Sequence, residues 1–536
     1  VYKRQAQARH FNYMKIEDIR YYNVPTPFSE LYYKTAFEQG QQLDAFFTVN
    51  TSPQFNFSIA YKGLRSLGKY QHILTSTGNF RFTTSYRTKN NRYVVNAHMT
   101  SQDLLNEENG GVRDDNIIFF ESGNPEFKDR AVLEVNFQDA ENKLEGKRFH
   151  WDHYYRLIQP KDSLSANTLT IGHIISYEDK FFRFEQTNQS DFLGDAFRSS
   201  NLSKEVKLED LHNQVRVAYS NRLLGVLQVN LGHNDFNYGY DNVVILNGNT
   251  ITNRLKGEVF SVGGSYQNTF NKFKVDAEFG LNVSGDFDGN YFMGRATYPL
   301  MQDVVLGASF NWSSKAPNYN FQLYQSDYIG YNWQNNFGNV KTQQIEFDLR
   351  SEKWAHLSFS FSTIDGYTYF QKDFDETVVK PFQNQATISY FKVKLEKDIR
   401  LGNFGLLNTL MFQTVNDENQ VFNVPEFITR NTLYYQNEFF NNALALQTGI
   451  NFSYFTEYNM NGYDPVLAEF YVQNQRAYGA FPRFDFFINA KVRQTRIFLK
   501  AEHFNSAWTG YNFYSAPNYP YRDFTVRFGL VWNFFL

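Results

Sequence analysis

The chain ends with RDFTVRFGLVWNFFL, residues 522–536, and this stretch decides the fold. Every second residue is apolar, which places large side chains on one face of an extended strand: Phe524, Val526, Phe528, Leu530, Trp532, Phe534 and Leu536. The opposite face carries Thr525, Arg527, Gly529 and Asn533. A strand that is apolar outward and polar inward is typical of a protein surrounded by lipid. The alternative, an edge strand of a soluble sheet, is disfavoured because the same alternation recurs along the chain.

The spacing of four residues in the same strand also resembles a known targeting signal. It resembles the C-terminal signal that the assembly machinery of outer-membrane barrels recognises, and four residues carry this resemblance: Arg527, Gly529, Trp532 and Phe534. We therefore expect these residues to act as a barrel-assembly signal during biogenesis.

The composition agrees with a membrane protein that crosses the bilayer with strands. Aromatic residues make up 18% of the 536 residues, with 56 Phe and 37 Tyr, yet the mean hydropathy is −0.52. This combination suits strands with one apolar and one wet face, together with aromatic girdles at the membrane interfaces. No run approaches the ~18 apolar residues that a membrane helix requires. A chain that spans the membrane in this way must form a closed barrel.

Charge and cysteine content exclude other classes of protein. The net charge of −3 provides no basic footprint for nucleic acid. The absence of cysteine excludes disulfide frameworks and thiol catalysis. No Pro-rich, Ser-rich or highly charged linker divides the chain into separate domains.

Short turns alternate with long polar loops along the chain. The expected short turns lie at Asn90-Asn91, Ser220-Asn221, Asn271, Pro299 to Gln302, Ser351 to Lys353, Gly402-Asn403, Asn441-Asn442 and Gln494. The expected long loops are 101–146, 187–204, 235–254, 313–339, 365–383, 456–481 and 507–521. This is the up-and-down pattern of outer-membrane barrels, which have short periplasmic turns and long extracellular loops.

The alternation predicts an all-β transmembrane barrel of about 22 antiparallel strands, within a range of 16–24, that begins near Ser29. Residues 1–28 are expected to form a periplasmic N-terminal extension, and residues 29–536 the barrel. The chain opens with Val1-Tyr2-Lys3-Arg4-Gln5, without Met or an apolar signal region, so we expect this extension to be truncated. The one expected exception to strand structure is a short helix between Ala131 and Leu144, inside segment 129–144.

Several segments resemble the putative-porin family of Bacteroidota outer membranes. They are Tyr22-Asn23-Val24-Pro25-Thr26-Pro27, Gln39-Gly40-Gln41-Gln42-Leu43-Asp44, residues 58–66, Tyr331-Asn332-Trp333-Gln334-Asn335 and Pro482-Arg483-Phe484-Asp485. The resemblance runs over the chain from about residue 16. It implies an outer-membrane barrel with porin-like function.

Charged residues on the inward faces are the candidate pore-lining residues. In the last three strands they form a basic stripe with one acid: Lys491, Arg493, Arg496, Lys500, Glu502 and Arg527. Acidic residues occupy two more distant strands: Asp276, Glu278, Glu346 and Asp348. Opposed basic and acidic walls would set a field across a water-filled pore and bias which solutes pass. The alternative is that these charges pair with one another and keep the lumen wet.

Signatures of catalysis and metal binding are weak. His150 and His153 lie three residues apart, which places them on opposite faces of a strand and argues against a shared metal ion. Segment 285–290 has its Gly too early for a calcium loop and lacks the terminal Glu. No phosphate-binding glycine loop or nucleophile elbow is present. We therefore expect no enzyme activity, no metal and no cofactor.

Three functions remain open. The leading one is a porin-like channel for the diffusion of small hydrophilic solutes, because barrels with many strands leave an aqueous lumen unless something fills it. The second is a barrel like that of a TonB-dependent transporter without its plug, since about 28 residues before the first strand leave no room for one. The third is a scaffold barrel in a surface-lipoprotein, secretion or assembly complex. Loop 101–146, with the acidic pairs Glu107-Glu108 and Asp114-Asp115, would either dock a partner or fold inward as a constriction.

The expected location is the bacterial outer membrane. The expected partners are outer-membrane lipid, the barrel-assembly machinery and small hydrophilic solutes. Surface lipoproteins or other outer-membrane proteins would be partners under the scaffold hypothesis, and nucleic acid would not be a partner.

Overall fold

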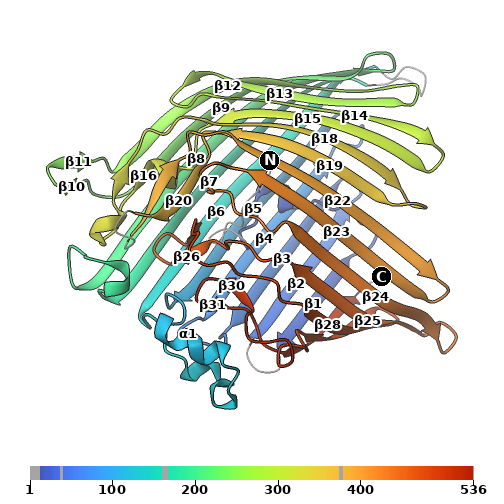
Figure 1. The fold of residues 1–536 in the computed structure, drawn as a ribbon. Helices are drawn as coiled ribbons and strands as arrows, with labels where there is room; N and C mark the ends of the chain where they lie inside the picture. Colours follow the sequence, from blue (N-terminus) through green and yellow to red (C-terminus); the bar gives the residue numbers. More distant parts are fainter. Residues whose placement is uncertain (1–11, 37–39, 160–166, 374–377, 535–536) are drawn as a thin grey trace.

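The chain folds as one closed antiparallel β-barrel, in which each strand pairs with the next and the last pairs with the first (Figure 1). The computed structural model describes residues 12–36, 40–159, 167–373 and 378–534. The barrel sheet has 22 strands, and it closes where β1 (Phe28–Ala36) pairs with β32 (Thr525–Phe534). The predicted fold class and the predicted number of strands are therefore confirmed. Leu536 and the opening residues Val1 to Gln5 lie outside the described residues.

Hairpins connect most of the remaining barrel strands. The first half comprises β2 (Gly40–Ser52), β3 (Phe55–Ser66), β4 (Thr75–Arg87), β5 (Tyr93–Glu108), β6 (Ala140–Ile158), β7 (Thr168–Asn188), β8 (Ser200–Asn221), β9 (Gly225–Gly239), β12 (Arg254–Phe270) and β13 (Phe273–Gly285). The second half comprises β14 (Gly289–Met301), β15 (Val304–Lys315), β18 (Val340–Ser351), β19 (His356–Asp365), β22 (Ile388–Leu401), β23 (Phe404–Asn416), β24 (Phe427–Phe439), β25 (Leu444–Phe455), β28 (Arg483–Val492) and β29 (Thr495–Glu502).

The loops contain further short elements. Two-residue to five-residue strands form small hairpins: β10 (Val244–Leu246) with β11 (Asn249–Ile251), β16 (Leu323–Tyr324) with β17 (Trp333–Gln334), β20 (Thr368–Lys372) with β21 (Val379–Gln383), β26 (Gly462–Asp464) with β27 (Glu469–Tyr471), and β30 (Tyr514–Ala516) with β31 (Tyr519–Pro520). The helices are α1 (Asp114–Glu121) and α2 (Tyr319–Gln322), with 3-10 turns at Ile16–Asp18, Pro125–Phe127, Arg130–Val132, Asp191–Leu193 and Ile329–Tyr331.

Two local predictions differ from the structure. The helix expected in 129–144 is wrong: the helix of this loop is α1, and β6 already begins at Ala140. The loop predicted as 101–146 is shorter, because β5 continues to Glu108. Both errors have one cause: some apolar residues between Ala131 and Leu144 pack inside the loop, and others pack on the inner face of a strand. Leu133 and Val135 are buried in the loop, whereas Leu144 is buried on the strand.

The outward face of the barrel is apolar around its circumference. Large exposed side chains point outward from strands on all sides, among them Phe149, Trp151, Val217, Val229, Leu231, Phe279, Phe347, Phe361, Phe412, Leu433 and Trp532. A soluble monomer rarely exposes so much contiguous apolar surface, so this band faces lipid. Among the described residues, no helix is long and apolar enough to cross a membrane.

The long strands β6, β7 and β8 reverse their hydrophobic faces partway along. They contain 19, 21 and 22 residues, far more than the ~9–11 that cross a bilayer. A row of charged residues on the outward face marks the change. In the strand register Lys147 lies opposite Asp179, and Asp179 lies opposite Glu209. Beyond this row the inward residues are apolar and buried, as with Leu144, Phe182 and Val206. The strands therefore extend beyond the lipid at the long-loop end.

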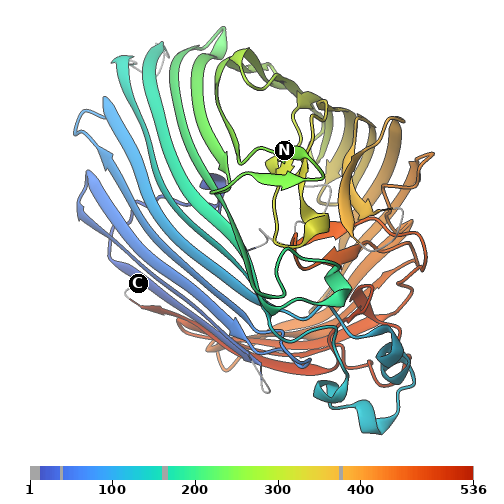
Figure 2. The ribbon, with the colours of Figure 1, turned by 90° about the vertical axis from the view of Figure 1, so that its left-hand side faces the viewer.

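Loops fold inward at the long-loop end and pack on these inward apolar faces. We call residues 316–339, 366–373, 378–387 and 456–482 the cap. Figure 2 looks onto this end, and the cap lies within the ring of strands, whereas α1 projects beyond the rim. Fully buried cap residues, including Leu323, Tyr328 and Leu467, join the inward residues of β5 to β9 in one hydrophobic core. The cap thus narrows the long-loop mouth of the barrel.

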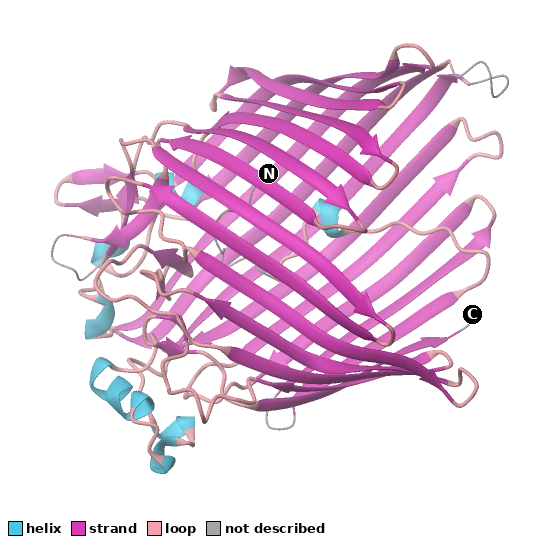
Figure 3. Ribbon diagram, turned by 45° about the vertical axis from the view of Figure 1, so that its right-hand side comes forward, coloured by secondary structure: helices cyan, strands magenta, loops and turns pink. Residues whose placement is uncertain are grey.

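Residues 12–27, which precede β1, also lie inside the barrel. We call them the N-terminal segment, and Figure 3 shows the barrel strands that surround it. The segment is fixed to the inner wall at two heights: the Val24 amide donates to Asn50 Oδ1 at 3.1 Å, and the Met14 amide donates to Gln102 Oε1 at 2.7 Å. It rises from the short-turn end toward the middle of the lumen.

Candidate functional site

The lumen wall at β28, β29 and β32 carries most of the predicted basic residues. Arg496 and Lys500 of β29 and Arg527 of β32 share the inward face with Glu502, and Lys491 has the same orientation on β28. Arg493 differs, because it lies in the turn between β28 and β29 with a φ of 53°. The placement of Arg493 on the lumen face is therefore wrong, since the strand ends one residue earlier than the alternation indicated.

The basic residues do not form an unpaired stripe. Lys500 Nζ lies 3.0 Å from Asp485 Oδ2 and 3.2 Å from Glu502 Oε1. Arg527 Nε lies 2.6 Å from Glu502 Oε2. Asp485 is only 3% exposed, so its charge depends on these partners. The expectation that Glu502 is the lone acid of this wall is wrong, because Lys500 also pairs with Asp485.

Two further ion pairs extend this network. Arg496 Nη2 lies 3.6 Å from Glu30 Oε2, which links β29 to β1 through the neighbouring β32. Arg522 Nη1 also reaches Glu502 Oε2 at 3.6 Å. Glu502 thus forms ion pairs with Lys500, Arg522 and Arg527 at once. The wall keeps an excess of positive charge.

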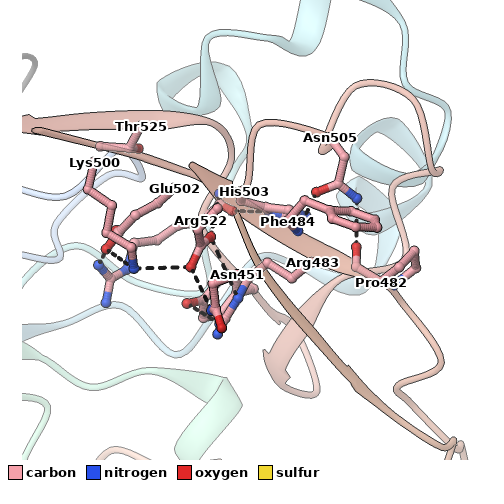
Figure 4. A network of polar contacts seen from close by, with 12 residues as sticks. Asn451, Pro482, Arg483, Phe484, Lys500, Glu502, His503, Asn505, Arg522 and Thr525 are labelled. Carbon is pink, nitrogen blue, oxygen red and sulfur yellow. Dashed lines mark hydrogen bonds and ion pairs between the residues drawn. The ribbon is translucent and has the colours of Figure 1, made fainter. Parts of the chain in front are cut away.

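Hydrogen bonds at the long-loop end hold the network in position. The His503 amide donates to Asp485 Oδ1 at 2.9 Å, and its Nδ1 lies 2.6 Å from the Arg522 carbonyl oxygen. Burial lowers the pKa of His503, so the ring is neutral at pH 7 and donates its Nδ1 proton to that carbonyl. Asn505 connects the ends of the strands, because it accepts from the Phe484 amide and donates to the Pro482 carbonyl (Figure 4).

The predicted acidic residues of β13 and β18 also face the lumen, and most have partners. Asp276 lies 3.1 Å from Lys274 Nζ, and Glu278 accepts from the Tyr291 hydroxyl at 2.7 Å. Among the residues that the structure describes, Glu346 has no ion-pair partner, and its neighbours across the ladder are Ser309 and Ser360. The side chains that remain available to a solute on this wall are therefore few.

Asp348 is the most buried of these acids, with 1% exposure. It pairs with Arg350 at 2.9 Å on its own strand and with Arg295, which lies two strands away on β14. The intervening position on β15 is Gly307, and a Cβ there would meet Asp348 Oδ1 at 2.5 Å and Arg295 Nη2 at 2.7 Å. The absence of a side chain at Gly307 therefore allows the ion pair to cross β15.

A central cluster that the sequence did not predict ties the N-terminal segment to the wall. Arg148 of β6, with 3% exposure, lies 3.3 Å from Glu178 and donates to the Met14 carbonyl at 3.1 Å. The Tyr13 hydroxyl donates to the same Glu178 carboxylate at 2.8 Å. Gly146 makes room for this, because a Cβ there would lie 2.1 Å from the Tyr13 hydroxyl.

His98 completes the cluster, and its hydrogen bonds define its tautomer. Arg148 Nε donates to His98 Nε2 at 3.2 Å, and an arginine has no acceptor to offer in return. The His98 proton is therefore on Nδ1, from which it is donated to the Tyr21 hydroxyl at 2.7 Å. The His98 and His150 rings stack with centroids 4.9 Å apart. The cluster thus fixes three residues of the N-terminal segment, Tyr13, Met14 and Tyr21, by polar contacts.

The four residues of the predicted assembly signal divide between the two faces of β32. Trp532 is 45% exposed on the outward face, and its ring centroid lies 4.1 Å from that of Phe534. Arg527 and Gly529 face the lumen. Gly529 has a packing role, because a Cβ there would lie 2.2 Å from Phe498 Cζ and 2.7 Å from the Tyr33 carbonyl. Their role in assembly stays a prediction.

Some of the missed residues had a signal in the sequence. Asp485 has the same parity on its strand as Lys491, and Glu30 follows the predicted start of the first strand, so counting by twos assigns both to the lumen. Arg148 and Glu178 had no such signal of pairing, because their contact depends on strand register and on the inward path of the N-terminal segment. Among the described residues, no group of three potential metal ligands is present. His150 faces inward and His153 outward, as their spacing predicts.

Comparison with known proteins identifies a family and a fold. The family model described as putative porin matches residues 2–536. No curated protein matches the chain.

Solved structures with similar folds are outer-membrane receptors and transporters. The siderophore receptor PirA from Acinetobacter baumannii has a TM-score of 0.66 at 10% identity, over 96% of this chain and 81% of that one. The copper transporter OprC has a TM-score of 0.67 at 9% identity, over 95% of this chain and 80% of that one. The FrpB iron transporter from Neisseria meningitidis gives 0.65 at 10% identity, over 95% and 82%. At this identity the likeness concerns the fold alone.

Proposed function

We propose, because the chain belongs to the putative porin family, that its barrel is a channel for small hydrophilic solutes. The protein resides in the bacterial outer membrane, with the short turns toward the periplasm and the long loops outside. Diffusion down a gradient is the transport mode that needs no further component.

One observation carries this proposal: the inner face of the closed barrel is polar and charged along the part that crosses the lipid. The ion-pair networks around Glu502 and Asp348 and the cluster around Arg148 all face the lumen. A wall of this kind keeps water inside the barrel, because each paired charge still attracts solvent.

The cap and the N-terminal segment narrow this route and give it selectivity. The cap is fixed to the wall by buried hydrogen bonds: the Tyr328 hydroxyl donates to Gln186 Oε1 at 2.6 Å, and the Tyr463 hydroxyl donates to Glu108 Oε1 at 2.6 Å. The Ser203 amide donates to Asp327 Oδ2 at 2.8 Å. We infer a channel of small conductance whose outer mouth is restricted by its own loops.

The remaining proposals concern chemistry and partners. We propose that the protein is not an enzyme and uses no cofactor. Its partners in this view are membrane lipid, the barrel-assembly machinery and the solutes. The acidic external loop around α1 supports an additional partner, a surface lipoprotein or another outer-membrane protein.

Liposome swelling tests the proposed function. Proteoliposomes that contain the folded, heat-modifiable protein should swell in arabinose, and more slowly in larger sugars. Empty liposomes, and liposomes with protein that was boiled before reconstitution, are the controls. Equal swelling in all three preparations would contradict diffusion through the barrel.

A barrel like that of a TonB-dependent transporter is the second candidate. It is favoured by the 22 strands and by the fold shared with the receptors above. This candidate predicts that no solute passes without a TonB-type energy source. Uptake by cells that lack the TonB system therefore separates the two: retained uptake favours the channel, and abolished uptake favours the transporter.

A further inference from the structure

Two neighbouring cavities lie at the extracellular end of the lumen, beside β1 to β4 and β32. The inner cavity has a volume of about 310 Å³, and the outer one about 460 Å³. Both are lined by the loop residues Gly68, Lys69 and Tyr70. The inner cavity alone reaches the barrel wall, whereas the outer one is bordered by the external segment 128–131.

The inner cavity has an excess of positive charge. Lys34, Arg522 and Arg527 line it. The two arginines share the single carboxylate of Glu502, which also pairs with Lys500. Asp523 lines the cavity too, but it is committed to Arg130 at 2.7 Å, and Arg130 is 3% exposed.

Lys34 is the third cation, and the acid that acts on it electrostatically is the same Glu502. Within the described ranges, no carboxylate lies within ion-pair distance of its ammonium group. A half-buried cation without a partner attracts an anion from solution.

A buried hydroxyl group adds a directional donor. The Tyr70 hydroxyl is buried and has no hydrogen-bond partner among the residues that the structure describes. Burial raises the pKa of Tyr70, so the group keeps its proton and can donate it. Buried polar groups in folded proteins are normally satisfied, and a ligand that accepts a hydrogen bond would satisfy this one.

Uncharged polar residues, among them Gln42 and Thr75, complete the lining of the inner cavity together with apolar side chains. Leu64 of β3, Ile73 of the same loop as Tyr70, and Pro520 of β31 contribute them. A site that combines a few cations and hydrogen-bond donors with apolar side chains is typical of small-molecule pockets of about 300–1,000 Å³. An inorganic anion would leave the apolar walls without contact.

We propose that the inner cavity binds a small organic carboxylate with an apolar body. Lys34, Arg522 and the Tyr70 hydroxyl hold the carboxylate, and Leu64, Ile73 and Pro520 contact the body. The outer cavity, lined by Lys69 and Lys128, is the approach from outside. We further propose that this carboxylate is a solute of the channel, which rests on the proposed function, whereas the binding site itself does not.

Binding of sodium benzoate to the folded protein in detergent, followed by isothermal titration calorimetry, tests the site. Benzamide, the neutral analogue, and inorganic phosphate are the comparison ligands. Benzoate should bind at least about tenfold more tightly than either. Equal binding of benzamide would overturn the charge argument, and tighter binding of phosphate would overturn the apolar body.

Two variants and one matched control sharpen this test. Tyr70→Phe and Lys34→Met should each weaken benzoate binding about tenfold, because a hydrogen bond or ion pair to a charged group is lost. Tyr70→Phe keeps the ring, so its packing is unchanged. Lys62→Met removes a lysine that faces the same lumen from β3 without lining either cavity, and it should leave binding unchanged. Unchanged binding in both test variants would overturn the proposal.

Conductance measured on the same preparations separates the site from the proposed function. Benzoate binding by a protein that never conducts would support the site and contradict the channel. Conduction with benzoate binding unaffected by Tyr70→Phe and Lys34→Met would support the channel and contradict the site.

Discussion

At the scale of single residues, Arg148 holds the N-terminal segment inside the lumen. It bridges Glu178 on the neighbouring strand, His98 on the strand before and the Met14 carbonyl. Because its side chain is almost fully buried, no water can replace these contacts without rearrangement.

Replacing Arg148 by Met should release the N-terminal segment and widen the route. The single-channel conductance is expected to rise, and the free energy of unfolding in urea to fall by ~3 kcal/mol, since a buried ion pair is broken from one side. Arg183→Met is the matched control, because Arg183 pairs with Glu185 on the outward face above the lipid. A conductance identical to that of the unmodified protein would show that the segment does not restrict the pore.

How far the sequence predicts a residue depends on whether its role is local. The lumen orientation of Lys500 and Asp276 follows from parity alone, and both predictions agree with the structure. The pairing of Asp348 with Arg295 could not be predicted, because it crosses β15 at Gly307 and requires the register of three strands. The alternation places Arg493 on the lumen face because it does not reveal that β28 ends at Val492 and that Arg493 belongs to the turn.

At the scale of elements, the terminal strand β32 closes the barrel with Trp532 and Phe534 facing lipid. Replacing both by Ser should reduce the amount of folded protein in the outer membrane several-fold, because polar side chains replace apolar contacts with lipid and the assembly signal is damaged. Heat-modifiability of membrane fractions measures the folded amount. Asn533→Ser, on the inward face between them, is the control and should insert normally. Normal levels of the double variant would show that this strand is not the recognised element.

The cap should respond to pH through Asp464 of β26. Its carboxylate accepts from the Tyr331 hydroxyl at 2.6 Å and from the Leu467 amide at 2.9 Å, and Glu108 and Lys372 are its titratable neighbours. Burial raises the pKa of Asp464 from 3.8 to about 6. The closed cap therefore favours the protonated form. This contribution is fully present below about pH 3.8 and is lost as the pH rises through about 6, a change of about 3 kcal/mol.

Hydrogen-exchange protection of the cap measures this effect. Protection factors in segment 456–482 should be higher at pH 5 than at pH 7.5 in the unmodified protein. Asp464→Asn cannot ionise, so its pH dependence should shrink to the part that comes from Glu108, whose pKa burial raises to about 8. A variant that kept the full pH dependence would assign the effect to another group.

The elements were more predictable than their extent. Short hairpin turns such as those at Asn271 and Gly402-Asn403 are local, and the structure has them where the sequence predicts them. The sequence pattern assigns the upper parts of β5 and β6 to a loop, because beyond the charged row at Lys147 the apolar residues change from the outward to the inward face. The cap was not predicted, since its core joins loops that are far apart in sequence.

At the scale of the whole molecule, the lumen wall should set ion selectivity. Replacing Arg496 and Lys500 together by Gln should shift the reversal potential in a KCl gradient toward cation preference, because Asp485, Glu502 and Glu30 then lose partners. Arg493→Gln is the matched control in the turn outside the wall, and its shift should be smaller. An equal shift from Arg493→Gln would contradict the assignment of the wall.

The central claim is that this polar-lined barrel is a channel whose outer mouth is narrowed by its own loops. Single-channel recording in planar bilayers tests it most directly, on the unmodified protein and on a variant with residues 317–337 replaced by a short Gly-Ser turn. We expect steady ohmic steps from both proteins, with larger steps from the shortened one. Silence from both, in preparations that remain folded and heat-modifiable, would contradict it.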